Sequence, residues 1–376
     1  MKILTGIDVP FIPFGGSLIC CDNWYSDLPG DVEVRFLALR PPSDERWWSI
    51  KDVKLLDIVK IKTPEAFPQY VTDLRKLVEE EIADFKPDIL HCQHLNYGLS
   101  RAFVDIQTDV PKLGICHGTD VQAATAYPFL HDNLIHICDG LDELVFPNQT
   151  MADDFFDVYP RQKKYVINPL GIPDRYYPET LTPPSFDGKR RLEVLYAGRL
   201  LAWKGADIAV EAMSHITEDM HLTVIGNEDE AGYVASMQTF IREHHLEDKV
   251  TFIPQLPRDD LLKAFSQYDV MVLPSRKLEA FSLTVIEAQA MGLPIIYGSG
   301  GGIVDTAGNG GIMLEKNTPE ELAKVLTELY HSPALLSKLQ HKGFTNAQSY
   351  KLSGSKDRLF ELSKELIAQC ADQTLR

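Results

Sequence analysis

Two carboxylates, Glu279 and Glu287, interrupt the largely apolar stretch LEAFSLTVIEAQAMGLP, residues 278–294. An α-helix turns about 100° per residue, so side chains eight positions apart diverge by roughly 80° and do not share one face. This spacing argues against a paired general acid and base on one helix. Ser282 belongs to a residue type that caps helix starts, and apolar residues recur at helical spacing from Leu283 onward. The pattern therefore predicts Glu279 in a loop and Glu287 one turn inside a helix.

A pair of cations lies in LYAGRLLAWKGADIAVEAM, where a predicted strand ends near Ala197 and a predicted helix begins around Gly205. Arg199 and Lys204 stand between the two elements. In an open α/β sheet, ligands bind beyond the carboxyl ends of the strands, and a helix N-terminus there offers unpaired N–H groups to phosphate. Two cations at such a turn suit a diphosphate; the alternative is a pair of solvated loop charges. The backbone amides of residues 281–283, which also follow a predicted strand, are expected to face the same cleft and favour the phosphate interpretation.

Two further motifs resemble ligand sites but are weaker. His91 and His94 in HCQHLNY have a metal-like spacing, yet they follow a predicted strand and no third or fourth ligand stands out, so we predict no metal site and favour a cleft-lining role for His94. The run GSGGG at residues 298–302 imitates a dinucleotide fingerprint but occurs after a late strand. A lone glycine cluster of this kind is weak evidence for NAD.

Composition sets the protein class. The 376 residues favour two domains, and the hydrophobic fraction of 44% and charged fraction of 24% are ordinary for a globular protein. A net charge of −17 argues against nucleic-acid binding, and no apolar run approaches the length of a membrane span. The start MKILTGIDV reads as a first strand without a signal peptide, so we expect a cytoplasmic location. The six cysteines form no CxxC pair and are expected to be free and mostly buried.

Short β-rich runs alternate with helical patterns along the chain, which predicts βαβ units and parallel sheets. The predicted strands cover residues 1–7, 32–39, 88–94, 112–118, 143–148, 165–172, 192–199, 221–227, 249–255, 269–275, 293–299 and 311–316. Residues 171–191, rich in Pro, Gly and charge, are the predicted linker between two α/β halves. The last stretch, residues 353–376, carries Leu359, Leu362 and Leu366 at helical spacing and predicts an amphipathic helix that needs a docking surface.

Taken together, the motifs resemble a known enzyme family. The patterns Y-A-G-R-L-x-x-x-K-G, P-S-x-x-x-E-A-F-S-L-x-x-I-E-A-x-A-x-G-L-P and N-G-G-I-M-L look like glycosyltransferase family 4, with PFGGS and HGTD as weaker matches in the first half. The resemblance implies a GT-B fold, with two Rossmann-like α/β domains whose parallel sheets face across a cleft. The expected boundaries are 1–172, joined by a C-terminal helix at about 355–376, for the acceptor-side domain, and 173–354 for the donor domain.

The resemblance assigns donor-binding roles in the second half. Arg199 and Lys204 would neutralise the donor diphosphate, Glu279 would bind hydroxyls of the donor sugar, and Glu287 would bind the ribose hydroxyls. The positions expected to contact the nucleobase, the phosphate and the sugar through backbone groups are Gln255, Leu256, Ala280, Phe281, Ser282 and Leu283. The family commonly has glycine where Ala280 and Ser282 stand, and this departure leaves the identity of the donor sugar open.

The resemblance also assigns residues in the first half. Gly15 and Gly16 resemble the glycine loop that approaches the donor phosphate, where a residue without Cβ lets the backbone come close. His117, in GICHGTD at a strand end, resembles the histidine that reaches the donor sugar and phosphate. With Arg199, Lys204 and Glu279 it completes the predicted catalytic set. Asp120 is expected to orient His117 or touch the acceptor, and His94 to lie on the acceptor side.

The expected activity follows from these assignments. The resemblance implies a retaining transferase that moves a hexosyl unit from a nucleoside-diphosphate sugar, with a UDP-sugar favoured, to a hydroxyl of a soluble small-molecule or glycan acceptor. No DxD element stands at a strand end, so neither a metal nor another cofactor is expected, and neither nucleic acid nor stable membrane insertion is predicted. The alternatives are transfer to a lipid-linked cell-surface glycan intermediate, a nucleotide-sugar 2-epimerase on the same fold, and a catalytically silent nucleotide-sugar binding protein.

Overall fold

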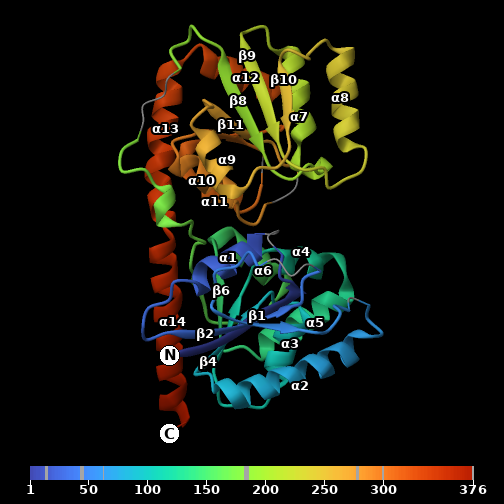
Figure 1. Ribbon diagram of the computed structural model, residues 1–376, viewed down its shortest axis with the longest axis vertical. Helices are drawn as coiled ribbons and strands as arrows, with labels where there is room; N and C mark the ends of the chain where they lie inside the picture. The colour runs from blue at the N-terminus through green and yellow to red at the C-terminus, as the bar shows by residue number, and fades with distance from the viewer. Residues whose placement is uncertain are drawn as a thin grey trace. The chain divides into compact units, whose positions relative to one another are not determined.

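The chain folds into two α/β units in a computed structural model (Figure 1). The structure describes residues 1–12, 16–42, 46–61, 63–181, 186–276, 279–298 and 300–374. Unit 1 comprises Met1–Gly171 and Leu352–Arg376, and unit 2 comprises Ile172–Lys351. These boundaries lie within three residues of those expected from the sequence.

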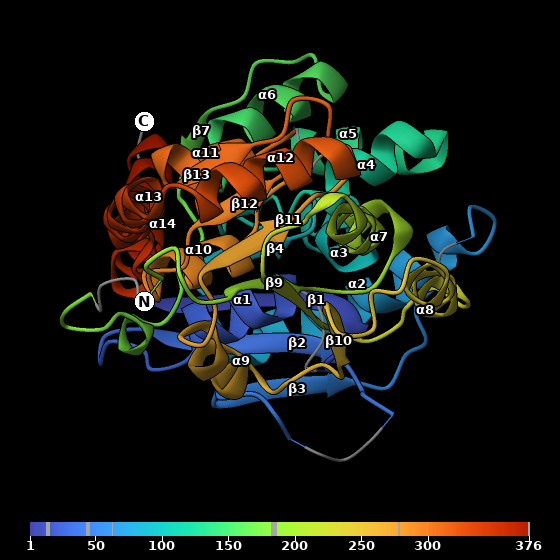
Figure 2. The ribbon, with the colours of Figure 1, turned by 90° about the horizontal axis from the view of Figure 1, so that it is seen from above.

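Unit 1 is built on a seven-stranded sheet in the order β3-β2-β1-β4-β5-β6-β7, with every neighbouring pair parallel. Its strands are β1 (Lys2–Pro10), β2 (Glu33–Leu39), β3 (Asp52–Leu56), β4 (Ile89–Gln93), β5 (Lys112–Ile115), β6 (Glu143–Phe146) and β7 (Tyr165–Ile167). The central strands are buried, as parallel strands covered on both faces must be. The edge strand β3, which pairs with β2 (Figure 2), was missed by the sequence interpretation because its sequence DVKLL mixes charged with apolar residues and only Leu56 is buried.

The described residues of unit 1 form the following α-helices. They are α1 (Gly16–Tyr25), α2 (Phe67–Phe85), α3 (Gly98–Asp105), α4 (Thr119–Ala126), α5 (Pro128–Asp139), α6 (Gln149–Val158) and α14 (Leu352–Thr374). The last of these is the predicted amphipathic helix, and its apolar face packs on unit 1 through the buried side chains Leu359, Leu362 and Leu366. The indole N–H of Trp24 in α1 donates to Ser355 Oγ in α14 at 3.0 Å, so the helix is also held by a buried polar contact.

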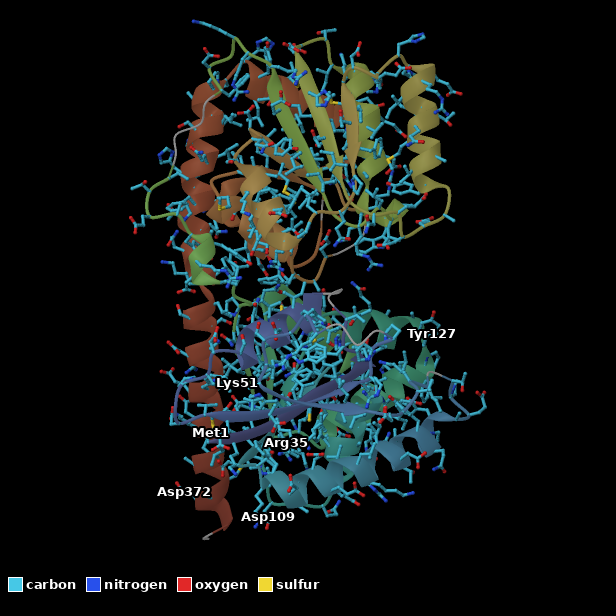
Figure 3. All side chains as sticks on the ribbon, viewed as in Figure 1. Met1, Arg35, Lys51, Asp109, Tyr127 and Asp372 are labelled. Carbon is cyan, nitrogen blue, oxygen red and sulfur yellow. The ribbon has the colours of Figure 1, made fainter. Side chains whose placement is uncertain are left out.

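A charged cluster ties the β3 edge of this sheet to α2. Arg35 of β2, labelled in Figure 3, lies 2.8 Å from Asp52 of β3 and from Glu81 of α2, and 2.6 Å from Asp84. Burial opposes the charge on Arg35, but hydrogen bonds to these carboxylates raise the pKa of its guanidinium overall. The cluster therefore compensates for the few apolar contacts that an edge strand makes.

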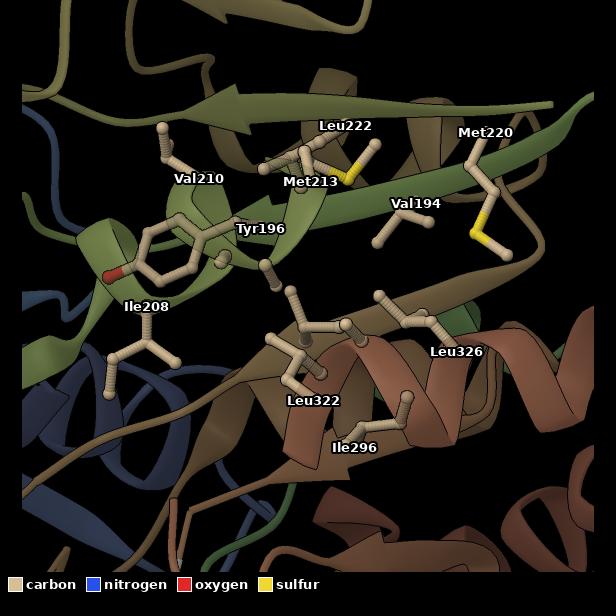
Figure 4. Packing of buried hydrophobic residues seen from close by; sticks show 14 of the residues in the cluster. Val194, Tyr196, Ile208, Val210, Met213, Met220, Leu222, Ile296, Leu322 and Leu326 are labelled. Carbon is tan, nitrogen blue, oxygen red and sulfur yellow. The ribbon is translucent and has the colours of Figure 1, made fainter. Parts of the chain in front are cut away.

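Unit 2 is built on a six-stranded parallel sheet in the order β10-β9-β8-β11-β12-β13. Its strands are β8 (Leu192–Ala197), β9 (Met220–Ile225), β10 (Val250–Ile253), β11 (Val270–Leu273), β12 (Ile295–Tyr297) and β13 (Gly311–Met313). Its α-helices are α7 (Ala206–Ala212), α8 (Tyr233–Glu243), α9 (Arg258–Phe265), α10 (Leu283–Ala290), α11 (Ile303–Ala307), α12 (Pro319–Tyr330) and α13 (Pro333–Ala347). One face of the sheet packs on α7 and α12, and Figure 4 shows this core with Val194, Tyr196, Ile208, Val210, Leu222, Leu322 and Leu326 among its members.

Each sheet reverses its direction of growth once. In unit 1, the chain winds outward from β1 to β3 and then returns to place β4 on the other side of β1; in unit 2, it winds from β8 to β10 and then places β11 on the other side of β8. Such a switch point opens a crevice at the carboxyl ends of the two adjacent strands, where ligands of open α/β sheets bind. The segments that follow β1 and β4, and β8 and β11, are therefore the places to look for a site.

Two expectations about composition can be checked against the described residues. All six cysteines are free thiols; five are buried and Cys370 is partly exposed, as predicted. No helix in the described part of the chain is long and apolar enough to cross a membrane.

Candidate functional site

The switch point of unit 2 brings two predicted catalytic residues together. Lys204 ends a short 3₁₀ helix (Ala202–Lys204) after β8, and Glu279 follows β11. Lys204 Nζ lies 2.9 Å from Glu279 Oε2, and the glutamate side chain is only 7% exposed. The second carboxylate oxygen, Oε1, accepts a hydrogen bond from Ser275 Oγ. A buried carboxylate is thus charge-compensated at one oxygen and hydrogen-bonded at the other.

The segments that carry these residues are locked together by backbone contacts. Gly205 has a φ of +76°, and a Cβ there would stand 2.0 Å from the carbonyl oxygen of Pro274, so only glycine fits. Beyond Pro274, the backbone N–H of Arg276 donates to Trp203 O at 2.7 Å. The Arg276 guanidinium then binds Asp207 of α7 through two hydrogen bonds of 2.7 and 2.6 Å. These contacts therefore fix the position of the loop after β8 against the loop after β11.

The backbone of Glu279 is held from a third side by the segment after β12. The Ile303 N–H donates to Glu279 O at 3.2 Å, and a Cβ at Gly301, where φ is +72°, would stand 2.7 Å from the same oxygen. Gly301 therefore serves close backbone packing around Glu279.

Arg199 turns toward a different partner. Its Nε lies 2.6 Å from Asp229 Oδ2, in the segment after β9, and its side chain is 66% exposed. The sequence analysis predicted Arg199 and Lys204 as two cations for one diphosphate; in the structure each contacts a separate carboxylate. Asp229 was not foreseen, although a carboxylate shortly after a strand end is the signal that could have indicated it.

Helix α10 begins at Leu283, as predicted, with Ser282 in the N-cap position. The Ser282 side chain nevertheless makes no capping hydrogen bond, so the prediction is right about the position and wrong about the hydroxyl. The first N–H groups of a helix have no partner within the helix. The end of α10 therefore offers amides and positive dipole to an anion, next to the partly buried Ala280 and Phe281.

Glu287 lies in the second turn of α10 and is buried. It forms an ion pair with Arg258, the first residue of α9. The sequence analysis missed Arg258, although a cation soon after the predicted strand at residues 249–255 was a usable signal. Since the pair neutralises a carboxylate that would be costly to bury alone, Arg258 accounts for the presence of Glu287 in an apolar helix.

The predicted nucleobase positions lie at the end of β10. The backbone N–H of Gln255 donates to Asn227 Oδ1 at 3.1 Å, and Asn227 Nδ2 donates to Gln255 Oε1 at 3.2 Å. Gln255 is exposed, while Leu256 packs partly against the apolar cluster on the α9 side of the sheet. Both residues therefore lie at the same sheet edge as Lys204 and Glu279, two strands away along the order β10-β9-β8.

In unit 1, His94, His117 and Asp120 form one cluster after β4 and β5. Asp120 Oδ2 accepts the backbone N–H of His117 at 2.7 Å, and Asp120 Oδ1 lies 3.2 Å from His94 Nδ1. The rings of His94 and His117 are 4.6 Å apart, and His94 adopts a φ of +60°, a strained value for a residue with a side chain. Asp120 was expected to orient His117. In the structure it contacts the backbone N–H of His117 and not its ring.

Burial and neighbouring charges set the protonation states in this cluster. Burial and the adjacent His94 lower the pKa of His117 to about 3, against the opposing effect of Asp120. Burial alone would raise the pKa of Asp120, but the charge and hydrogen bond of His94 lower it to about 2. At neutral pH, His117 is therefore a neutral imidazole and Asp120 a carboxylate.

Three other residues of unit 1 that the sequence analysis considered are Gly16, Gly15 and His91. Gly16 begins α1, and among the described residues a Cβ there would meet nothing within 4 Å, so their packing does not demand glycine at this position. Gly15 lies outside the described residues. His91 is a core residue between Tyr25 OH at 2.8 Å and Ser363 Oγ at 2.9 Å, and no group of three potential metal ligands occurs in the described part of the chain.

Comparison with known proteins identifies the second half of the chain. Residues 182–348 match the family model described as glycosyl transferases group 1. This segment resembles a glycosyl transferase group 1 domain and is called the group 1 domain below. A D-inositol 3-phosphate glycosyltransferase of Paenarthrobacter aurescens is 28% identical over 231 residues, which cover 57% of this chain and 55% of the relative. For a second relative of the same name the share is 42%, so the chain spans about half the length of the curated relatives it matches.

Solved structures extend the likeness to both units. Sucrose-phosphate synthase from Thermosynechococcus elongatus aligns with a TM-score of 0.79 at 19% identity and covers 98% of this chain and 99% of its own. Anabaena HepE in complex with UDP aligns with a TM-score of 0.78 at 16% identity and covers 97% and 100%. The fold is GT-B, as predicted. The family model matches at the level of group 1 over residues 182–348, and the assignment to family 4 stays a prediction.

Within the group 1 domain, the pair Lys204–Glu279 is the central feature of the candidate site. It stands at the switch point, between the loops that follow β8 and β11, and beside the open N-terminus of α10. The arrangement places a cation, a fixed carboxylate and the first amides of α10 at one sheet edge. Such a set can bind an anion and a polyhydroxylated group side by side.

Proposed function

We propose that this chain is a retaining, metal-independent glycosyltransferase of the cytoplasm that takes a hexosyl unit from a nucleoside-diphosphate sugar, with a UDP-sugar favoured. The observation that carries the proposal is the ion pair between Lys204 and Glu279 at the switch point of the group 1 domain. Two solved structures with the same fold, both of Anabaena HepE, are complexes with UDP and with UDP-glucose, and this supports the choice of donor.

The leaving group sets the main electrostatic demand. A nucleoside diphosphate departs with about two negative charges, which fixed positive groups in a desolvated site stabilise by several kcal/mol. Lys204 is held beside the site by Glu279 and packs 4.4 Å from the centre of the Trp203 ring. The N-terminus of α10 supplies dipole and amides, and the exposed Arg199 exchanges its partner Asp229 for phosphate when the donor binds. These groups take the role that a carboxylate-bound metal plays elsewhere.

The two carboxylates have separate partners and separate tasks. Glu279, fixed by Ser275 and by its backbone contacts, accepts hydrogen bonds from hydroxyls of the donor sugar. Glu287, neutralised by Arg258, accepts hydrogen bonds from the ribose hydroxyls. Because hydroxyl donors bind strongly to carboxylates, this division places the sugar near the end of β11 and the nucleoside nearer α9.

The transfer step needs no second carboxylate. The bond between the anomeric carbon and the diphosphate oxygen breaks, the acceptor oxygen bonds to that carbon on the same face, and the acceptor proton moves to the departing phosphate oxygen. The configuration at the anomeric carbon is retained. Lys204 acts on the developing phosphate charge, and Glu279 holds the sugar in place during the exchange.

The acceptor is a small hydroxylated molecule. The curated relatives are named for transfer to D-inositol 3-phosphate, a soluble polyol, which supports this class. Helix α2 of unit 1 carries the acidic run Glu79–Glu81. Its two cations, Arg75 and Lys76, lie 3.5 Å from Glu79 and 3.7 Å from Asp73, so the helix gives an anionic membrane no concentrated basic surface.

The test is a release assay with UDP-, GDP- and ADP-sugars, each with soluble polyols, simple sugars and a lipid-linked glycan as acceptors, in the presence of EDTA. We expect one donor to release its nucleoside diphosphate only when a soluble acceptor is present, and NMR of the product to show the donor's anomeric configuration. Inversion, a requirement for a divalent metal, or an epimerised donor without acceptor would each contradict the proposal. Transfer to the lipid-linked glycan alone would refute the acceptor class.

A further inference from the structure

A chain of buried hydrogen bonds in unit 1 leads from α14 to His117. It involves five side chains that are fully or almost fully buried: Thr5, Tyr25, His91, Gln93 and Ser363. Two backbone carbonyl oxygens terminate it. Because a carbonyl oxygen can only accept, the direction of every bond in the chain can be deduced from these ends.

The first end lies in α14. Ser363 Oγ is 2.8 Å from the carbonyl oxygen of Leu359, so its only hydroxyl proton points there. The Ser363 oxygen then accepts from His91 Nε2 at 2.9 Å, which places a proton on that nitrogen. Burial lowers the pKa of His91 to about 3, so its ring carries a single proton at neutral pH. His91 Nδ1 is therefore bare and accepts the hydroxyl proton of Tyr25 at 2.8 Å.

The second end lies at the carbonyl oxygen of His91, which accepts from Thr5 Oγ1 at 2.9 Å. The hydroxyl protons of Thr5 and Tyr25 are thus both used, and both oxygens can accept. They do so from Gln93 Nε2, at 3.2 Å and 2.8 Å. Both amide protons of Gln93 are spent, so the other end of its amide group, Oε1, is the atom that faces His117.

His117 completes the chain, since its Nε2 lies 2.7 Å from Gln93 Oε1. An amide oxygen only accepts, so His117 Nε2 must carry a proton. Reversing all directions would remove the bond from Ser363 to Leu359 and one of the two bonds of Thr5, and buried groups would lose these partners.

We propose that Gln93 is a positioning residue that fixes His117 as the neutral tautomer protonated on Nε2, so that Nδ1 is presented as a hydrogen-bond acceptor to a substrate hydroxyl. The low pKa of His117 supports the neutral state. In the described part of the chain, no hydrogen bond is formed at Nδ1. The other ionisable side chains that face this cluster are Tyr25 from α1, His94 after β4, and Cys116 and Asp120 after β5.

The proposal changes what His117 can recognise. A bare ring nitrogen repels the oxygens of an ionised diphosphate, which have no proton to donate. His117 therefore selects a hydroxyl group of the sugar or of the acceptor, and the expectation that its ring also contacts phosphate is dropped. This consequence rests on the proposed glycosyl transfer, whereas the tautomer itself does not.

The tautomer is tested by ¹⁵N NMR on the full-length protein with labelled histidines, using a His117→Gln variant to assign the signals. We expect a single set of His117 signals at neutral pH, with Nε2 protonated and Nδ1 unprotonated. A His117 ring protonated on Nδ1, or on both nitrogens, would overturn the proposal. This measurement needs neither donor nor acceptor, so it stands or falls apart from the proposed function.

The role of Gln93 is tested by Gln93→Met, which keeps the volume and removes the acceptor. We expect the His117 signals to shift away from the pure Nε2-protonated form and kcat/KM to fall roughly tenfold, the scale of one weakened hydrogen bond. Gln289→Met, at an equally buried glutamine of unit 2 that bonds Ala307 O at 2.8 Å, is the matched control and should leave the His117 signals unchanged. Unaltered His117 signals in a folded Gln93→Met would refute the role, and the wild-type spectrum decides the tautomer if that variant does not fold.

Discussion

Replacing Lys204 by methionine separates the two tasks of its ion pair with Glu279. The charged atoms are 2.9 Å apart, which at an effective dielectric constant of about 20 corresponds to an attraction of about 6 kcal/mol, partly offset by dehydration. Because Glu279 is buried, its loss of a counter-charge should lower the free energy of unfolding by about 3 kcal/mol. If Lys204 also stabilises the departing diphosphate, kcat should fall by about 100- to 1000-fold.

The double variant Lys204→Met with Glu279→Gln distinguishes these effects. The neutral amide no longer needs a counter-charge, so we expect stability to return to within about 1 kcal/mol of the wild type. Turnover should stay as low as in the single variants, because the cation at the phosphate is still missing. Urea unfolding followed by circular dichroism gives the stability, and nucleotide release gives the turnover. Recovery of both quantities in the double variant would refute the phosphate role and leave a purely structural pair.

A second lysine–glutamate pair provides the matched control. Lys164 Nζ lies 2.8 Å from Glu143 Oε2, and the Glu143 side chain is 3% exposed. Glu143 is the first residue of β6, so it stands at the amino end of its sheet, opposite to the edge where ligands bind. Lys164→Met should therefore destabilise the protein to a similar degree while kcat stays unchanged.

Three further outcomes follow from the structure. Gly205 has a φ of +76° and faces Pro274 O, so Gly205→Ala should lower the free energy of unfolding, measured with urea, by roughly 1–3 kcal/mol. Turnover should also fall, because the preceding loop is displaced. An alanine variant of wild-type stability would contradict the local geometry. Burial would raise the pKa of Asp120, but His94 lowers it to about 2. The ionised Asp120 therefore contributes roughly 2 kcal/mol to the free energy of unfolding, and this contribution is present above pH 4 and lost as the pH falls toward 2. Asp120→Asn should flatten the pH dependence of unfolding in that window, and an unchanged slope would count against the shift. Under native conditions a thiol reagent should modify Cys370 alone, and rapid modification of two or more thiols per chain would contradict the burial of the other five.

Much of the fold could be predicted from the sequence because parallel strands that are buried on both faces consist of short apolar runs. Twelve such runs correspond to strands, while β3 was missed because its sequence DVKLL alternates charged and apolar residues instead of forming an apolar run. The start of α10 at Leu283 and the amphipathic α14 were also readable from local periodicity. These are features that neighbouring residues in the chain determine.

The site was readable only in part because its contacts join distant segments. The sequence indicated Lys204 and Glu279 separately, but their contact depends on the adjacency of β8 and β11, which spacing does not reveal. Arg199 was expected beside Lys204 and instead contacts Asp229, because the exposed side chain meets the segment after β9. The hydrogen-bond chain that ends at His117 joins side chains from segments between β1 and α14. Because these segments are far apart in the sequence, no local motif could have predicted it.

We propose that the edge of unit 2 around Lys204 binds a nucleoside diphosphate without a metal. This is tested by isothermal titration calorimetry of UDP, GDP and ADP into the wild type and into Lys204→Met, in buffer with EDTA. At a nucleotide concentration of 100 times the dissociation constant, the free energy of unfolding of the wild type should rise by about 2.7 kcal/mol. We predict that one nucleotide binds the wild type at a single site and binds Lys204→Met at least about tenfold more weakly. Binding that requires a divalent metal, or equal affinity in the two proteins, would contradict the account.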